Sequence, residues 1–294
     1  MEDSEKMLEH LRLGADSTID LRGGNYAIMD LRKVNLSGAD LTMADLSKAN
    51  LTKAKLTKAK LREAKLNAAI LIHTKLNEAE LILTNLTKAN LVKADLSMAL
   101  LTKADLSGAN LRGAMLAETE IIGAEIAEAD LTKANLMHAS LKDASLIKAK
   151  LKSAKLANAD LSNADLTGAD LTGADLSYAN LMDAKFNNAN LSRANLKGAR
   201  ITYAFLKNAK LTGADLSGAD LAYTDLKMAN LENANLSNAR LNWTDLTHAD
   251  LRKANLAGAD LSNSLLIKAN LMGADLKNAD LTDAVLNGAL LSKL

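Results

Sequence analysis

The chain has no cysteine and no proline among its 294 residues, and only 2% of its residues are aromatic. The absence of cysteine excludes a disulfide framework and a thiolate metal site. The absence of proline is consistent with a backbone that uses every N–H group for hydrogen bonds to neighbouring segments. So few rings in a chain that is 48% hydrophobic indicate an interior too narrow for aromatic side chains.

The chain also has no excess of either charge and no long apolar run. Lys and Arg number 36 against 35 Asp and Glu, which gives a net charge of +1. No apolar run approaches membrane-spanning length, and the N-terminus lacks the basic region and apolar stretch of a signal peptide. We therefore expect a cytoplasmic protein without a membrane partner.

What the chain does contain is a five-residue repeat. A large apolar residue stands at every fifth position from Leu31 to Leu291, 53 times without a break, and it is nearly always Leu. From Ala39 to Ala289 the residue two positions earlier is nearly always Ala. The exceptions are Ile121, Ile126, Phe186 and Ile201 for Leu, and Thr74, Thr84, Thr119, Thr224, Thr244 and Ser264 for Ala. Each repeat thus has two fixed positions that build the fold and three free ones that can carry specificity.

A five-residue period excludes both an amphipathic helix and a flat strand. On an α-helix, steps of five residues would place the leucines on every face and leave no apolar side to bury. In a flat strand, an odd period would send successive leucines to opposite faces. The period therefore predicts a solenoid, in which each coil buries its apolar residues against its neighbours.

The repeats at 164–168 (Ala-Asp-Leu-Thr-Gly) and 234–238 (Ala-Asn-Leu-Ser-Asn) closely resemble those of the pentapeptide-repeat family. The resemblance covers residues 19–294 and implies an all-β fold, a right-handed quadrilateral β-helix with four pentapeptides per coil. At the usual strand spacing of roughly 4.8 Å, about 13 coils would make a rod on the order of 60 Å long. No linker or change of composition interrupts the repeat, so we expect one repeat domain over residues 19–294.

Residues 1–18 precede the repeat and are expected to form a short capping helix and a lead-in. Ser4 is a candidate N-cap for this helix, and Gly14 is a candidate terminator.

At the other end, outward positions become apolar. These positions are Leu265, Ile267, Val285 and Leu290, and together with Leu294 they are the candidate dimer contacts. Two interpretations remain open: the last coil frays and its apolar residues fold over the open end, or two copies pair there as a homodimer.

The sequence predicts neither an enzyme nor a metal or cofactor site. Within the repeat, His73, His138 and His248 fall on three different sides of a twenty-residue coil, so no pair can share a metal or a proton. Most Asp and Glu residues stand just before the Leu, and we interpret them as solvated surface carboxylates. We therefore expect a protein without catalytic residues.

Members of the pentapeptide-repeat family that protect DNA gyrase resemble duplex DNA and carry extended acidic surfaces. In this chain the charges fall in bands around the coils, basic at 53–65, acidic at 118–130 and basic again at 142–155. Bands of this kind do not form the acidic column along the coils that mimicry of a DNA strand requires. A DNA-mimic modulator of DNA gyrase or topoisomerase is therefore the alternative function and not the first choice. The basic band at 53–65 has no aromatic residue, so direct nucleic-acid binding is not expected.

Three of the seven aromatic residues form a pattern of their own. Tyr203, Tyr223 and Trp243 stand twenty residues apart, so a twenty-residue coil would place them in one outward column. Phe205 lies just round the same corner. The adjacent column reads Arg200, Asp220, Arg240 and Asp260. Either the rings form a self-contained stack with charges paired beside it, or they bind a protein, because aromatic residues rimmed by Arg are typical of interface hot spots.

A second, weaker patch is aliphatic and consists of Ile82, Leu83, Met98, Leu100 and Ile122. Taken together, the residues predict a non-enzymatic, rod-shaped scaffold for protein–protein contact. By similarity to cyanobacterial members of the family, we expect a bacterial regulatory protein. Its partner is predicted to bind at Tyr203, Phe205, Tyr223, Trp243, Arg200 and Arg240.

Overall fold

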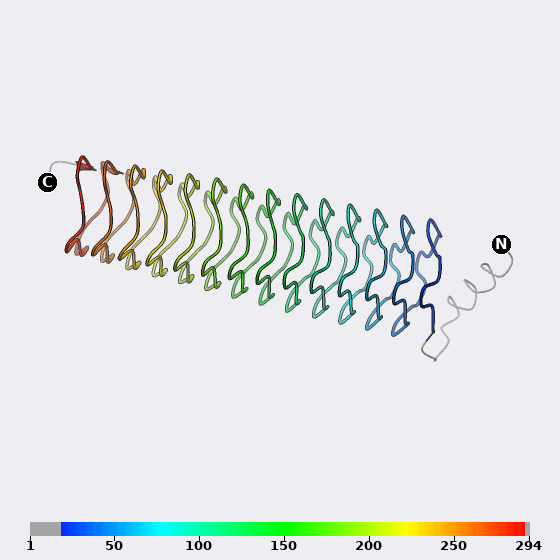
Figure 1. Ribbon diagram of the computed structural model, residues 1–294. Helices are drawn as coiled ribbons and strands as arrows, with labels where there is room; N and C mark the ends of the chain where they lie inside the picture. Colours follow the sequence, from blue (N-terminus) through cyan, green and yellow to red (C-terminus); the bar gives the residue numbers. More distant parts are fainter. Residues whose placement is uncertain (1–18, 292–294) are drawn as a thin grey trace. The chain divides into compact units, whose positions relative to one another are not determined.

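The structure, a computed structural model, describes residues 19–291. The chain divides into two compact units, residues 1–144 and 145–294. Below, unit 1 means residues 19–144 and unit 2 means residues 145–291. In each unit the chain winds through a stack of similar small coils, from blue to green in unit 1 and from green to red in unit 2 (Figure 1). The prediction of one domain over 19–294 stays a prediction.

Each coil takes twenty residues, because parallel bridges join residues that lie twenty apart. An example in unit 1 joins Asp40 with Lys60. In unit 2, strand β1 (Asn270–Leu271) pairs in parallel with strand β2 (Leu290–Leu291) one coil later. Elsewhere in the described residues the coils are joined by single-residue bridges. Four pentapeptides per coil, which the sequence alone did not fix, are therefore observed, and the β-helix is confirmed.

The fixed positions of the repeat fill the interior of both units. Every large apolar residue of the repeat from Leu31 to Leu271 is at most 2% exposed, and every small one from Ala39 to Ala269 is at most 1% exposed. Phe186 replaces a Leu and is equally buried. Full burial of such a side chain stabilises the fold by about 1.5 to 3 kcal/mol, so the regular layers of Leu and Ala hold successive coils together.

Each repeat turns at the two residues that follow its Leu. The turn is closed by a hydrogen bond from the Ala N–H to the Leu carbonyl, 3.0 Å long between Ala169 and Leu166. The second turn residue, named the tip below, has a positive φ in all 54 repeats from Gly23 to Gly288, and only 13 of these tips are glycine. The fold therefore holds 41 other residues in a left-handed conformation that L-residues disfavour.

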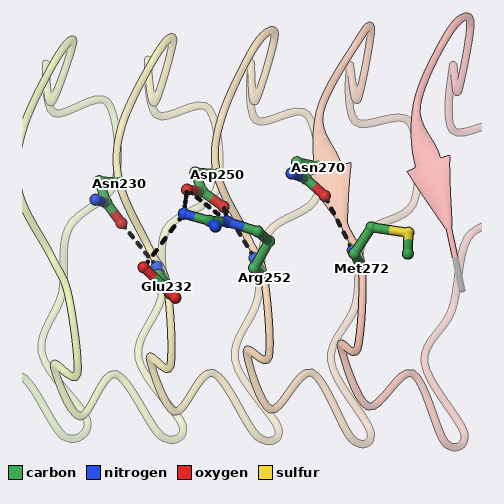
Figure 2. Close-up of polar contacts among 6 residues, drawn as sticks. All are labelled: Asn230, Glu232, Asp250, Arg252, Asn270 and Met272. Carbon is green, nitrogen blue, oxygen red and sulfur yellow. Dashed lines mark hydrogen bonds and ion pairs between the residues drawn. The ribbon is translucent and has the colours of Figure 1, made fainter.

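An Asp or Asn just before the Leu has a role that the sequence analysis missed. Its Oδ1 accepts a hydrogen bond from the backbone N–H two residues later, as Asp165 does from Thr167 at 2.9 Å. The same bond recurs in successive coils at Asn230, Asp250 and Asn270 (Figure 2). The interpretation of the aspartates as merely solvated was incomplete, because their side chains also cap the turn.

Arg252 shows how charged side chains also join neighbouring coils. Its guanidinium lies 2.6 Å from Asp250 in its own coil and 3.3 Å from Glu232 in the preceding coil (Figure 2). The hydrogen bond from Arg252 lowers the pKa of Asp250 below its usual value. Such partly exposed pairs stabilise a protein only modestly, so the ladder of backbone bonds and the buried leucines dominate.

The capping helix predicted for residues 1–18 lies outside the described residues. Within residues 19–291 no helix is long and apolar enough to cross a membrane.

The last described coil of unit 2 is more open than the others. Leu276, Leu281 and Leu286 are half-buried there, whereas the same position is buried in the preceding coils. Leu290 and Leu291 are 55% and 48% exposed. This end of unit 2 therefore presents apolar side chains to its surroundings.

Candidate functional site

The structure brings the three predicted rings together in unit 2. Tyr203, Tyr223 and Trp243 occupy the tips of three successive coils and stack nearly parallel, with interplanar angles of 9° and 7°. Ring centroids lie 5.0 Å apart between the two tyrosines and 6.2 Å apart between Tyr223 and Trp243. The rings are 50%, 48% and 54% exposed in chain order. The predicted outward column is confirmed. The three rings together with Phe205, Arg200 and Arg240 are named the aromatic corner.

The tip position is an unusual place for these rings. The backbone φ is 61° at Tyr203, 62° at Tyr223 and 63° at Trp243, and bulky residues rarely adopt such values. The strain is on the order of 1 kcal/mol per residue. Of the 29 tips in unit 2, 16 are Gly or Asn, which tolerate this conformation best. The turn itself therefore does not explain three rings in succession.

Both flanks of the column carry the predicted residues. Phe205 is 45% exposed on the face that follows the corner, and Arg200 and Arg240 are exposed on the face that precedes it. Arg240 pairs with Asp220 of the preceding coil at 3.2 Å, so the predicted charge pairing is confirmed there. Within residues 19–291, Arg200 makes no ion pair. Its guanidinium is therefore available to a partner.

Polar atoms around this corner are incompletely satisfied. Thr202 Oγ1 and Asn242 Oδ1 each precede a ring residue in sequence, and both are buried without a hydrogen-bond partner, as is Ser264 Oγ. By contrast, the buried Thr84 Oγ1 of unit 1 donates to the Leu61 carbonyl at 2.7 Å. Because an unpaired buried polar atom destabilises a fold, this corner is not optimised for stability alone.

An ion pair lies on the same face of unit 2 as Phe205. Lys227 Nζ lies 2.9 Å from Asp245 Oδ2. Burial acts to raise the pKa of Asp245, but hydrogen bonds from Thr247 and Lys227 outweigh it and hold that pKa below 3.8. The bond to Asp245 raises the pKa of Lys227 in turn. These two charges satisfy each other, and Phe205 is the exposed aromatic residue of this face.

One exposed ring was missed by the sequence analysis. Tyr178 occupies a tip and is 59% exposed, and its ring lies across Gly198, the tip of the next coil at the same corner. A methyl group placed on Gly198 would lie 2.6 Å from this ring. A large tip residue twenty positions before a glycine tip is the sequence signal that could have predicted this contact. The contact joins two coils of the same fold and does not by itself indicate a partner.

The predicted aliphatic patch in unit 1 is less prominent than expected. Leu83 and Met98 are 45% and 53% exposed, but Ile82, Leu100 and Ile122 are half-buried. Two of the five side chains therefore project from the surface.

The histidines and carboxylates do not form a metal centre in the described structure. Within residues 19–291, no three His, Asp or Glu side chains gather into a group that could hold a metal ion. His73, His138 and His248 each occupy a separate tip.

Comparison with known families agrees with this geometry. A family model of pentapeptide repeats matches the chain in eight copies that together span residues 30–292. The chain therefore belongs to the pentapeptide-repeat family, which implies a right-handed β-helix. No curated protein matches the chain by sequence.

Among solved structures, the chain is similar to HetL, a pentapeptide repeat protein involved in heterocyst differentiation regulation from the cyanobacterium Nostoc sp. strain PCC 7120. The identity is 31% over 97% of this chain and 95% of HetL, with a TM-score of 0.48. It is also similar to AT2G44920 from the Arabidopsis thaliana thylakoid lumen, with 38% identity over 33% of this chain and 68% of that one, at a TM-score of 0.33.

A third match is QnrB1, a plasmid-mediated fluoroquinolone resistance protein. It is 19% identical over 64% of this chain and 88% of QnrB1, with a TM-score of 0.33. This similarity is too distant to carry an argument about function.

Proposed function

We propose that the chain is a non-enzymatic, cytoplasmic scaffold for protein–protein contact, and that the aromatic corner of unit 2 binds its protein partner. The supporting observation is the stack of half-exposed rings at tips where Gly or Asn would be less strained. Tyr, Trp and Arg are the residues most enriched in interface hot spots. The proposal includes a bacterial regulatory role, which extends to this chain what the description of HetL says of that protein.

The test compares what three forms of the protein retain from an extract of its native host. The wild type is compared with a triple variant, Tyr203→Asn, Tyr223→Asn and Trp243→Asn, and with the control Tyr178→Asn, which removes an equally exposed ring at another tip. We expect at least one protein that the wild type and the control retain and the triple variant loses. The same retained proteins in all three forms would contradict the proposal.

The alternative, a DNA-mimic modulator of DNA gyrase, finds less support at this surface. A mimic of the phosphate backbone requires acidic columns, whereas the column beside the rings alternates in sign and Asp220 is neutralised by Arg240. Supercoiling by DNA gyrase, measured with and without the protein, separates the two functions. The scaffold proposal expects no change, and a dose-dependent change would favour the alternative.

We also propose that the C-terminal coils of unit 2 pair with the same coils of a second copy. Leu265 and Leu290 are 36% and 55% exposed, while Ile267 and Val285 are half-buried. Leu294, the fifth predicted contact, lies outside the described residues. A two-fold contact would cover these apolar side chains.

Changing both Val285→Lys and Leu290→Lys places like charges across the two-fold axis. Light scattering at micromolar concentration should then report a folded monomer, whereas the wild type and the tip control Asp283→Lys stay dimeric. A monomeric wild type would overturn the dimer proposal.

A further inference from the structure

A column of positive charge runs along one corner of unit 1. Six successive coils place their tips there, and these tips are Lys33, Lys53, His73, Lys93, Gly113 and Lys133. The residues just before them add Arg112, whereas Arg32 is paired with Asp30, and none of these twelve turn residues is acidic. The tips and Arg112 are named the basic corner.

The other three tip columns of unit 1 do not share this property. Each of them contains at least one Glu or Asp, and one of them pairs its own charges, with Lys58 Nζ 3.3 Å from Glu78. Within the described residues, Lys53, Lys93 and Lys133 are exposed and make no ion pair. The positive charge of the basic corner is therefore not neutralised by the protein itself.

A hollow of about 280 Å³ opens in the middle of the basic corner. Gly113, Lys93, Arg112 and Lys133 line it. The hollow forms where the column has a glycine, and the stem of Lys93 lies beside it, 3.6 Å from where a methyl group on Gly113 would stand. Three cations around one depression suit a carboxylate or phosphate group, because charge-assisted bonds to such anions are the strong ones.

Aliphatic side chains lie among the cations. Ile70 and Met115 beside the corner are 37% and 44% exposed, and Ile72 and Val92 on it are half-buried. A phosphate backbone offers no apolar surface to them. Single-stranded nucleic acids are usually held by stacking on aromatic rings, and Tyr26 is the only aromatic residue between 19 and 144. The mixture of unpaired cations and aliphatic surface therefore favours an acidic polypeptide with apolar residues.

We infer that the basic corner binds an extended acidic segment of a protein partner. Successive coils follow one another at roughly 4.8 Å, so Lys93, Arg112 and Lys133 lie one coil apart, while carboxylates on alternate residues of an extended chain lie roughly 6.6 Å apart. The flexible four-carbon stem of Lys accommodates this difference. The inference rests on the proposed scaffold function and adds a second contact surface to it, on the other unit of the chain.

The probe is a fluorescein-labelled peptide of twelve residues that alternates Glu and Leu, with a Glu and Ser peptide and a Lys and Leu peptide for comparison. Binding is measured by fluorescence anisotropy at low and at physiological salt. The test variant combines Lys53→Glu, Lys93→Glu and Lys133→Glu. The matched control combines Lys48→Glu, Lys88→Glu and Lys103→Glu, with the same change of net charge at the tips of other corners.

Both variants are expected to fold, because Glu63, Glu78, Glu118 and Glu128 already occupy tips with the same backbone conformation. Thermal melting checks this expectation. The Glu and Leu peptide should bind the wild type more tightly than either comparison peptide. Its affinity should fall about tenfold or more in the test variant and stay within about threefold in the control.

An equal loss in both variants would overturn the inference, because attraction by net charge alone would then explain the binding. Tighter binding of a short DNA duplex or of phosphatidylglycerol vesicles through the same lysines would also overturn it. Failure here would leave the scaffold proposal standing if the partner that depends on Trp243 is still retained. The experiments can therefore disprove the inference about the basic corner without disproving the scaffold proposal.

Discussion

The tips of unit 1 and unit 2 carry different residues around the same interior. In both units the repeat leucines are at most 2% exposed as far as Leu271, and the tips share a φ near 60°. Of the 25 tips in unit 1, eight are Lys and four are Glu, and none is Asn. Of the 29 tips in unit 2, eight are Asn and eight are Gly. The interior is therefore the same in both units, and the residues at the tips distinguish them.

This difference indicates where to look for function. Unit 2 mostly relaxes its turns with Gly and Asn, so its rings at Tyr203, Tyr223 and Trp243 stand out as exceptions. Unit 1 keeps strained, charged tips instead, and in one corner these charges share a sign. In both units, the candidate surfaces are columns of tips that are mostly not Gly or Asn and that share one chemical character, aromatic in unit 2 and basic in unit 1.

The largest effect should come from the shared interior. Leu91 in unit 1 and Leu166 in unit 2 are both 0% exposed, and replacing either by Lys buries a charge without a partner. Each change should lower the free energy of unfolding by several kcal/mol, on the order of 3 to 5. Denaturant unfolding of both variants measures this loss. A loss in one unit only would contradict the equivalence of the two interiors.

Acid should destabilise the turns of both units. Hydrogen bonds from turn residues lower the pKa of Asp40 and Asp45 in unit 1, and of Asp280 in unit 2, below 3.8. Their contribution to stability is therefore present above that value and is lost as the pH falls through the lower folded pKa. The melting temperature should stay level between pH 7 and pH 5 and fall below about pH 4.

Asp245→Asn provides the control for this prediction. The amide keeps the oxygen that accepts the bond from Thr247 but cannot titrate, and the pKa of Asp245 is among those lowered. The melting temperature of the Asp245→Asn variant should therefore fall less in acid than that of the wild type. A melting temperature that holds down to pH 2 in the wild type would show that these bonds do not depend on charge.

A smaller effect separates a tip that carries a contact from one that does not. Gly198 and Gly218 have nearly equal φ values of 63° and 64°, but only Gly198 lies under a ring, that of Tyr178. Ala at either tip should cost about 1 kcal/mol of backbone strain. Gly198→Ala should cost more than Gly218→Ala by denaturant unfolding, and the difference should vanish when Tyr178→Asn is added. Equal losses in the presence of the ring would refute the contact.

The smallest effects concern buried hydroxyls. Ser264→Ala removes an oxygen without a partner and should leave stability unchanged or raise it by up to about 1 kcal/mol. Thr84→Ala removes the bond to the Leu61 carbonyl and should lower stability by about 1 kcal/mol or more. Thermal melting of the two variants checks the signs. The opposite order would mean that Ser264 Oγ has a partner in solution.

Much of the fold could be predicted from the sequence, because a five-residue period admits few geometries. The burial of Leu and Ala and the outward column at Tyr203, Tyr223 and Trp243 follow directly once the coil is taken as twenty residues long. That length came from the family resemblance, since a period of five alone does not say how many repeats close a coil.

Other features could not be predicted in the same way. The left-handed tips carry 41 residues other than glycine, so residue preference gave no warning of them. The capping role of Asp165 appears only when the backbone N–H of Thr167 is placed beside it. The basic corner was hidden because its lysines lie twenty or forty residues apart in the sequence, and the acidic residues between them belong to other corners.

The most direct test of partner binding at the aromatic corner is the free energy of unfolding of Trp243→Asn, measured together with the affinity of this variant for the partner that the wild type retains. Asn occupies the neighbouring tip Asn263 at the same corner. Loss of stacking on Tyr223, about 1 kcal/mol, should be largely offset by relief of backbone strain of similar size. We expect stability within about 1 kcal/mol of the wild type and affinity weaker by about 2 kcal/mol or more. A variant that loses more than about 2 kcal/mol of stability yet keeps its partner would show that the rings are a structural ladder.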